Sequence, residues 1–167
     1  MTTQAPTTPN VRPAQLSWVA QQLTTSANTL VRGILRAPCH GLLSGTMLLL
    51  TFTGRKSGRR FTTPVTYLPV DETLLIFTDR PWAKNLEGGA MVSLRLRGRE
   101  VPAQATVTAD PGAVAQGIAT FLGRKGLRNA WQIDLRLDTQ RTPTADELRA
   151  LVERDGRMLI RVTPEAL

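Results

Sequence analysis

The sequence predicts an α+β protein in which a small antiparallel β-barrel or sandwich carries helices at its periphery. Five short apolar stretches follow one another between residues 46 and 108, separated by tight turns. An amphipathic segment precedes these stretches, and two helical patterns with one more strand follow them. The chain has 167 residues, of which 41% are hydrophobic, so it is long enough for one domain whose core needs no disulfide or metal.

The N-terminal region divides into a tail and a helix. Residues 1–13 are rich in Thr and Pro and have almost no large apolar side chain, so we expect a flexible tail. In residues 14–36, apolar side chains recur at steps of three and four residues, which predicts an amphipathic helix that ends before Pro38. We expect residues 14–167 to form a single domain that includes this helix.

Five strands are expected next, because each is a short run of β-forming residues bounded by turn residues. A helical pattern of one or two turns, starting at a proline, precedes the fourth strand. The last two strands alternate between apolar and polar residues around a Gly-Arg turn, which is typical of a hairpin. The expected strands are residues 46–53, 61–69, 73–78, 91–97 and 100–108, and the helical turns are residues 81–86.

The rest of the chain predicts two helices and a sixth strand. Asp110-Pro111 is a typical N-cap and first-turn pair, so we expect a helix over residues 111–122. The spacing of Thr and Glu in Thr144–Glu147 is that of a capping box, which predicts a second helix to about residue 154. Residues 158–162 follow a glycine and predict the last strand.

Charge is distributed unevenly along the chain. The formal net charge is +8, yet no Asp or Glu occurs before Asp71, whereas seven Arg and Lys residues do. An acid-free first half suggests an anionic partner, which is a nucleic acid, a membrane surface, or a small molecule with phosphate or carboxylate groups. The plain alternative is a protein that is merely rich in arginine.

The residue types present exclude several kinds of chemistry. The chain has one cysteine, Cys39, and one histidine, His40, which excludes an internal disulfide framework and a multi-histidine or thiolate-rich metal centre. No acid lies near this pair in sequence, so no nucleophilic triad is expected and no catalytic side chain is assigned. If the protein is an enzyme, a bound cofactor must carry the chemistry. No signal peptide or membrane span is recognised, so a cytoplasmic protein is expected.

The most informative stretch is residues 51–64, TFTGRKSGRRFTTP. Its two glycines, Gly54 and Gly58, enclose basic residues, and glycine allows successive backbone N–H groups to form an anion-binding concavity. The spacing is not that of a P-loop, and a strand rather than a helix is expected after it. The alternative is a solvated hairpin tip with turn glycines.

Two motifs resemble one known family. The string from Leu50 to Gly58, followed by Arg60 and residues 62–65, is similar to the signature of the deazaflavin-dependent nitroreductase family. PWAKNL, residues 81–86, resembles the P-x-W-x-x-N-L segment of the same family. This resemblance implies a split β-barrel of about six mostly antiparallel strands that binds coenzyme F-420, a deazaflavin whose tail carries a phosphate and several glutamates. The reduced coenzyme would transfer a hydride to a quinone, a nitro compound or a similar activated acceptor.

The resemblance also implies which residues bind the coenzyme. The phosphate and tail would contact Arg55, Lys56, Ser57, Arg59 and Arg60. The ring would lie along Thr62, Thr63, Pro64 and Val65, with Thr78, Asn85 and Leu86 in the neighbouring wall. Substrate contacts are expected from Trp18 and Trp131.

Some features differ from the family pattern and leave alternatives open. The link between residues 73–78 and the PWAKNL motif is short and contains Asp79, which leaves room for FMN with its shorter tail. A flavin- or heme-binding barrel without turnover is a second possibility. A basic barrel that binds RNA or single-stranded DNA is a third, although aromatic residues make up only 5% of the chain and such binding uses aromatic stacking. The expectations also include a homodimer and peripheral contact with a membrane.

Overall fold

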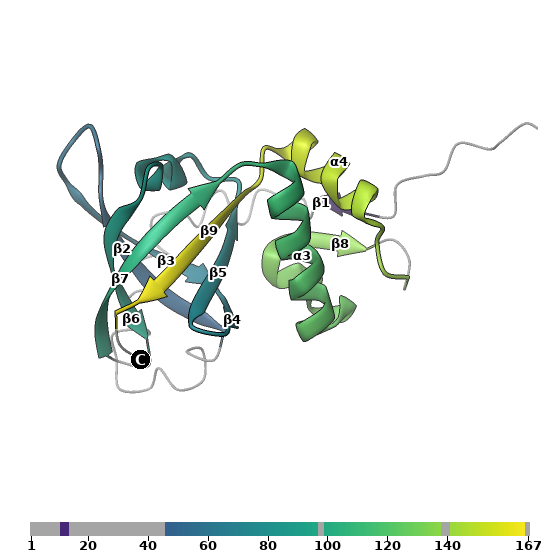
Figure 1. Ribbon diagram of the computed structural model, residues 1–167, viewed down its shortest axis with the longest axis horizontal. Helices are drawn as coiled ribbons and strands as arrows, with labels where there is room; N and C mark the ends of the chain where they lie inside the picture. Colours follow the sequence, from purple (N-terminus) through teal and green to yellow (C-terminus); the bar gives the residue numbers. More distant parts are fainter. Residues whose placement is uncertain (1–10, 14–45, 97–98, 138–140, 166–167) are drawn as a thin grey trace, which may run out of the picture.

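The computed structural model describes residues 11–13, 46–96, 99–137 and 141–165. A curled seven-stranded antiparallel sheet forms one side of the molecule, and α3 and α4 cover it on the other side (Figure 1). The strands of this sheet are β2 (Met47–Thr53), β3 (Arg60–Thr66), β4 (Leu68–Val70), β5 (Thr73–Thr78), β6 (Ala90–Leu96), β7 (Arg99–Thr108) and β9 (Met158–Pro164). The other elements are β1 (Val11–Pro13), the 3-10 helices η2 (Pro81–Leu86) and η3 (Leu127–Ile133), α3 (Pro111–Lys125), β8 (Leu135–Leu137) and α4 (Ala145–Asp155).

The strand order of the large sheet is β3-β2-β6-β7-β9-β5-β4. The two edge strands, β3 and β4, are therefore consecutive in the chain, and only Tyr67 separates them. Because one residue spans less than 4 Å, the sheet has to curl until its two edges meet at this corner. The Tyr67 backbone N–H donates to the Thr46 carbonyl at 3.1 Å, and its side chain is buried. This curled half-barrel agrees with the expected split β-barrel.

The inside of the curled sheet holds the first hydrophobic core. Alternate residues of the strands point inward, and they are joined there by Ala83 and Leu86 of η2, both with 0% exposure. Helix η2 therefore fills one opening of the barrel. The buried members of this core are Leu48, Leu50, Phe52, Val65, Tyr67, Leu74, Ile76, Ala83, Leu86, Val92, Leu94, Ala103, Ala105, Met158, Ile160 and Val162.

The second core lies between the outside of β4, β5 and β9 and the helical layer, which consists of α3, η3 and α4. Leu75 and Phe77 of β5 belong to this core, whereas their neighbours Leu74 and Ile76 belong to the first. The Phe77 ring meets the Phe121 ring of α3 edge-on, with 6.2 Å between centroids. Burial on both faces explains why β5 is a continuous apolar run.

A buried arginine joins the helical layer to the barrel. Arg157, at the start of β9, is 4% exposed and donates to the carbonyls of Ile133 and Asp134 at the end of η3. Burial lowers the pKa of the Arg157 guanidinium, and the charge of Asp134 opposes that shift. The hydrogen bonds to Arg157 satisfy two carbonyls at a helix end that would otherwise lack partners.

Most of the expected elements are confirmed, and the strand count is corrected. Residues 73–78 and 81–86 form β5 and η2 with the expected bounds. The sheet has seven strands rather than about six, because residues 61–69 do not form one strand: the chain turns from one sheet edge to the other at Tyr67. Strand β8 and helix η3 were not expected.

The structure describes only a small part of the N-terminal region, so it tests few of the expectations for that region. The helix expected over residues 14–36 lies outside the described residues, as do Cys39 and His40. Of the tail expected over residues 1–13, the structure describes Val11–Pro13, which form β1 and pair with β8. None of the helices in the described ranges has the length and apolar character needed to cross a membrane.

We predict opposite effects of the same substitution at two glycines of α3. A Cβ on Gly117 would lie 3.0 Å from Leu159 Cδ2 and 3.2 Å from Phe77 Cε1, whereas a Cβ on Gly123 would meet nothing within 4 Å. Gly123→Ala should therefore stabilise the fold by up to about 1 kcal/mol through helix propensity. Gly117→Ala should destabilise it by about 1 kcal/mol, since overpacking outweighs the same gain. Thermal unfolding measures both, and stabilisation by Gly117→Ala would contradict the close packing of α3 on the sheet.

Candidate functional site

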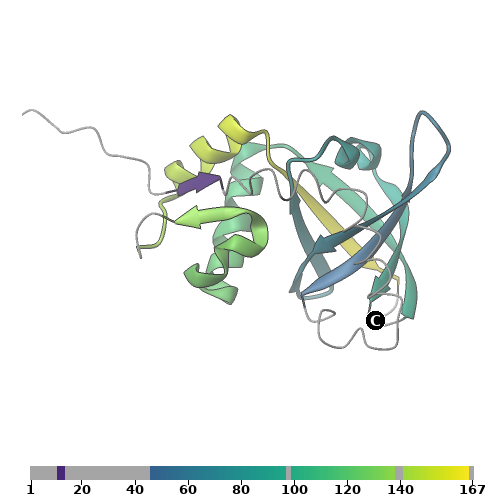
Figure 2. The same cartoon turned by 180° about the vertical axis from the view of Figure 1, so that it is seen from behind.

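The β2–β3 loop, residues 54–59, is a tight turn held by its own backbone. The Gly58 N–H donates to the Gly54 carbonyl at 2.8 Å, and the Gly54 N–H donates to the Arg59 carbonyl at 2.8 Å. Gly58 has φ of +64°, a left-handed conformation that glycine adopts without strain. The loop projects from the side of the barrel away from α3 and α4, as Figures 1 and 2 both show.

The base of the loop rests on stacked aromatic rings. The Phe52 ring lies between Phe61 and Trp82, with centroid distances of 5.7 and 5.2 Å and interplanar angles of 26° and 22°. A Cβ on Gly54 would lie 2.7 Å from Ser57 Oγ and 2.8 Å from Phe61 Cε2. Only glycine therefore fits at this point, because the loop backbone approaches the Phe61 ring so closely.

Helix η2 holds the loop through one side chain. Asn85 Oδ1 accepts a hydrogen bond from the Arg55 backbone N–H at 3.0 Å, and Asn85 Nδ2 donates to the Trp82 carbonyl at 2.8 Å. The two sequence motifs are thus in direct contact, although 30 residues separate Arg55 from Asn85. The PWAKNL motif closes the barrel with its apolar residues and fixes the loop with its asparagine.

The loop presents a cluster of positive charge to solvent. Lys56, Arg59 and Arg60 are exposed, and none of them makes a salt bridge with any other residue that the structure describes. Arg55 differs, because its guanidinium pairs with Glu87 at 3.2 Å. Within the part of the chain that the structure describes, these three cations, two in the loop and one at its exit, lack an ion-pair partner, and such a surface suits a multiply charged anion.

Beside the loop, hydroxyl groups cross the outer face of the sheet. Thr62 of β3 is opposite Thr51 of β2, and their hydroxyl oxygens are 2.9 Å apart. Ser93 of β6 is opposite Thr51 on its other side. Directly opposed residues of antiparallel strands point to the same face, so the three side chains form a row. We call it the hydroxyl row; it offers donors and acceptors to a polar ring edge.

The structure brings most of the expected coenzyme-binding residues together around the loop. Arg55, Lys56, Ser57, Arg59 and Arg60 lie in the turn or at its exit, and Thr62 and Pro64 lie on the outer face next to it. Thr63 and Val65 are opposite the inward residues Leu50 and Leu48, and Val65 is only 8% exposed. The Val65 side chain therefore belongs to the barrel core.

The remaining expected residues lie elsewhere. Leu86 is fully buried in the barrel core, and the Thr78 hydroxyl accepts a hydrogen bond from the Arg80 backbone N–H at 3.1 Å. Trp131 is 65% exposed in η3, in the helical layer, away from the side where the loop projects. Trp18 is outside the described residues. The structure thus does not bring Trp131 to the loop.

Sequence reasoning missed three residues around the loop, Thr51, Ser93 and Glu87. Thr51 and Ser93 become visible only through strand register, although Thr51 opposite Thr62 follows from a regular hairpin closed by the loop. Trp82 is partly buried against the barrel core and stacks on Phe52. Nothing in the sequence signals the pairing of Arg55 with Glu87, which lies just beyond the family motif.

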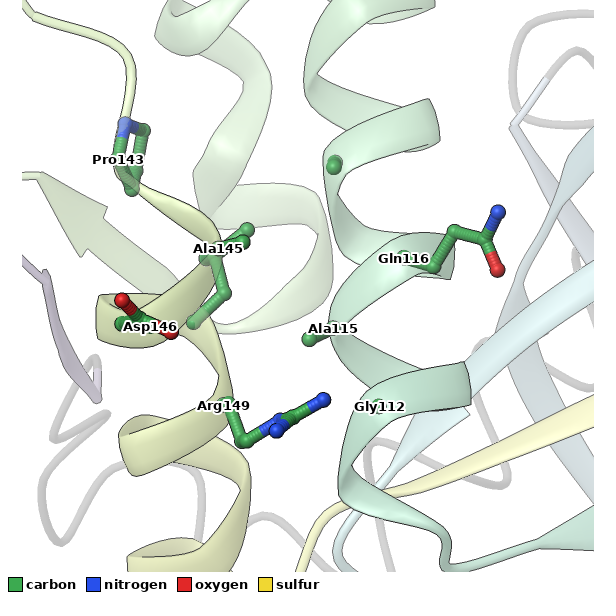
Figure 3. Close-up of a pocket in the computed structure, with 9 residues that line it drawn as sticks. Gly112, Ala115, Gln116, Pro143, Ala145, Asp146 and Arg149 are labelled. Atoms are coloured by element: carbon green, nitrogen blue, oxygen red, sulfur yellow. The ribbon is translucent and has the colours of Figure 1, made fainter.

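A separate cavity lies between α3 and α4, with a volume of about 310 Å³ (Figure 3). Small residues line its α3 side, and Arg149 extends from α4 toward Gly112. Its charged lining residues are Asp146 and Arg149, which have opposite charges. This cavity lacks the cationic cluster of the β2–β3 loop and lies in the helical layer, so we place the functional site at the loop.

The fold and the loop define a split-barrel protein with an exposed cationic turn. A family model described as F420H(2)-dependent quinone reductase matches residues 15–116, which is more than half of the chain. The chain belongs to this family, and it is therefore an oxidoreductase that uses the deazaflavin coenzyme F-420. The match confirms the resemblance of the two motifs and makes FMN unnecessary as an alternative. No curated protein matches the chain significantly.

Solved structures with similar folds have low sequence identity to this chain. One described as a domain-swapped dimer is 14% identical with a TM-score of 0.46, covering 87% of this chain and 96% of that chain. HutZ, a heme storage protein from Vibrio cholerae, is 15% identical with a TM-score of 0.43, and the match covers 83% of this chain and 90% of HutZ. An F420 reductase is 16% identical with a TM-score of 0.39, and the match covers 81% of this chain and 93% of the reductase.

The residues at the loop fit the charge of the coenzyme. Lys56, Arg59 and Arg60 are exposed there and form no salt bridge with another residue that the structure describes. Between Thr51 and Val65 the chain has no carboxylate that would repel an anion. The adjoining hydroxyl row supplies neutral polar groups, which suits a ring with a polar edge.

We predict that Asn85→Ala detaches the loop from η2. Loss of both Asn85 hydrogen bonds should destabilise the protein by about 1–2 kcal/mol. Lys84→Ala is the matched control, because Lys84 is the exposed neighbour in the same helix, and it should change stability by less than about 0.5 kcal/mol. Urea unfolding compares the two variants, and equal stability would contradict the anchoring role of Asn85.

Proposed function

We propose that this protein reduces a quinone with a hydride from reduced F-420, and that it binds this coenzyme at the β2–β3 loop. The observation that carries the proposal is the loop itself: three exposed cations without salt bridges among the described residues, on a turn fixed by two glycines. The family match supplies the coenzyme and the reaction class. The acceptor class and the individual binding residues are our assignment.

In this proposal the protein acts by binding and orientation. Lys56, Arg59 and Arg60 bind the phosphate and glutamate tail of the coenzyme through charge-assisted hydrogen bonds. The hydroxyl row and the backbone from Thr62 to Val65 face the polar edge of the deazaflavin ring. When bound, the reduced coenzyme supplies the hydride, and the quinone also takes up one proton to become a hydroquinone.

The side chains of the hairpin segment around the loop support this division of labour, while Glu87 next to it is paired with Arg55. Between Thr51 and Val65 the chain contains no carboxylate, thiol or imidazole, so these residues offer no strong nucleophile or general base. Their contribution to the rate is then the alignment of two bound molecules, which by itself lowers a barrier substantially. The exposed position of the loop leaves the acceptor access from solvent.

We predict that removal of two cations, one in the loop and one at its exit, strongly weakens coenzyme binding without affecting the fold. Lys56→Ala combined with Arg60→Ala removes two charge-assisted contacts, each of about 1.5–3 kcal/mol, so the affinity for F-420 should fall by at least about 100-fold. Quenching of tryptophan fluorescence measures the affinity, and absorbance of the coenzyme follows its oxidation by a soluble quinone.

The matched control is Lys125→Ala combined with Arg128→Ala, which removes the same two charges from the helical layer. This control should bind F-420 like the original protein. Equal losses in both double variants would mean that general charge, and not the loop, determines binding. Turnover with a nitro compound but with no quinone would overturn the acceptor assignment.

The expected homodimer, the cytoplasmic location and the peripheral contact with a membrane stay predictions. A quinone is an apolar acceptor, and a membrane would be its natural reservoir, which gives membrane contact a chemical reason. Sedimentation of the protein with and without lipid vesicles measures both the oligomeric state and the contact.

A further inference from the structure

Of the four cations in or next to the loop, Arg55 already has an ion-pair partner within the protein. Arg55 makes three contacts with η2 and the residue after it: its backbone N–H donates to Asn85 Oδ1 at 3.0 Å, Nη1 donates to the Glu87 carbonyl at 3.3 Å, and Nη2 pairs with Glu87 Oε2 at 3.2 Å. The Arg55 side chain thus points along the protein surface to Glu87. Lys56, Arg59 and Arg60 have no such partner among the residues that the structure describes.

The geometry of the loop explains why an arginine that is paired within the protein can affect anion binding by its unpaired neighbours. Residues 54–59 join two strands and project from the barrel, so apart from their own turn hydrogen bonds they depend on contacts from outside the hairpin. An anion that binds a mobile loop loses affinity because the loop has to be ordered first. Contacts that order the loop in the free protein remove that cost.

We propose that Arg55 is a positioning residue: Glu87 and Asn85 hold it, and it keeps the loop backbone in the conformation in which Lys56, Arg59 and Arg60 bind the anionic tail. This inference rests on the proposed function and assigns a different role to Arg55 than to its neighbours. In the competing arrangement, Arg55 leaves Glu87 and binds the anion directly.

A charge-neutral double variant separates the two arrangements. Arg55→Met combined with Glu87→Gln removes the ion pair but leaves the net charge of the loop region unchanged. The matched control is Asp71→Asn combined with Arg124→Met, because Arg124 and Asp71 form another exposed ion pair, at 3.8 Å, remote from the loop. Arg60→Met serves as the reference for a residue that binds the anion itself.

The first measurement needs no coenzyme. Hydrogen exchange of the Arg55 and Gly58 amides, followed by NMR in the free protein, should be faster in the Arg55/Glu87 variant and unchanged in the Asp71/Arg124 control. Unchanged exchange in the Arg55/Glu87 variant would overturn the positioning role. Because this readout is independent of ligand, it stays decisive even if F-420 does not bind and the proposed function fails.

The second measurement is the affinity for F-420 as a function of salt. The Arg55/Glu87 variant should bind F-420 about 3- to 10-fold more weakly, with the same salt dependence as the original protein. In turnover, its KM for F-420 should be raised and its kcat unchanged. Arg60→Met should bind more weakly with a shallower salt dependence, because one direct charge contact is lost. A shallower dependence in the Arg55/Glu87 variant, or an affinity equal to that of the original protein, would overturn the proposal.

Discussion

The whole architecture depends on one short connection. Tyr67 alone joins β3 to β4, the two edges of a seven-stranded sheet, so the sheet has to curl. The curl creates an interior that apolar side chains of the strands fill, and η2 fills one opening of the barrel with Ala83 and Leu86. The same curl leaves β2 and β3 as a hairpin whose loop stands next to η2. The position of the cationic loop beside η2 is thus a consequence of how the barrel closes.

At this end of the barrel, structural and functional roles are divided between neighbouring residues. Ala83 and Leu86 of η2 point into the core, whereas Asn85 of the same helix holds the loop. On β3, Val65 points inward and Thr62 points outward to the hydroxyl row. A helix packed into the core and a strand of the sheet therefore support an exposed cationic turn. This arrangement gives a binding protein precise placement of charge without burying any of it.

The sequence predicted the elements whose signals are local, and it failed where tertiary contacts decide. Residues 73–78 were predicted correctly because burial on both faces makes them continuously apolar. Residues 61–69 read as one strand in the sequence, since nothing in their composition shows that the chain changes sheet edge at Tyr67. The loop glycines and cations were recognised from the motif. The hydroxyl of Ser93 and the pairing of Arg55 with Glu87 were not, because both depend on residues far apart in sequence.

The most direct test of the account is an NMR titration of the isotope-labelled protein with F-420. If the β2–β3 loop and the hydroxyl row form the coenzyme site, the backbone amides of residues 54–63 and of Ser93 should shift together, with a single dissociation constant. The amides that line the cavity between α3 and α4, such as those of Ala115 and Leu148, should stay unchanged. Shifts confined to α3 and α4, with none in the loop, would contradict the central claim that this cationic turn binds the coenzyme.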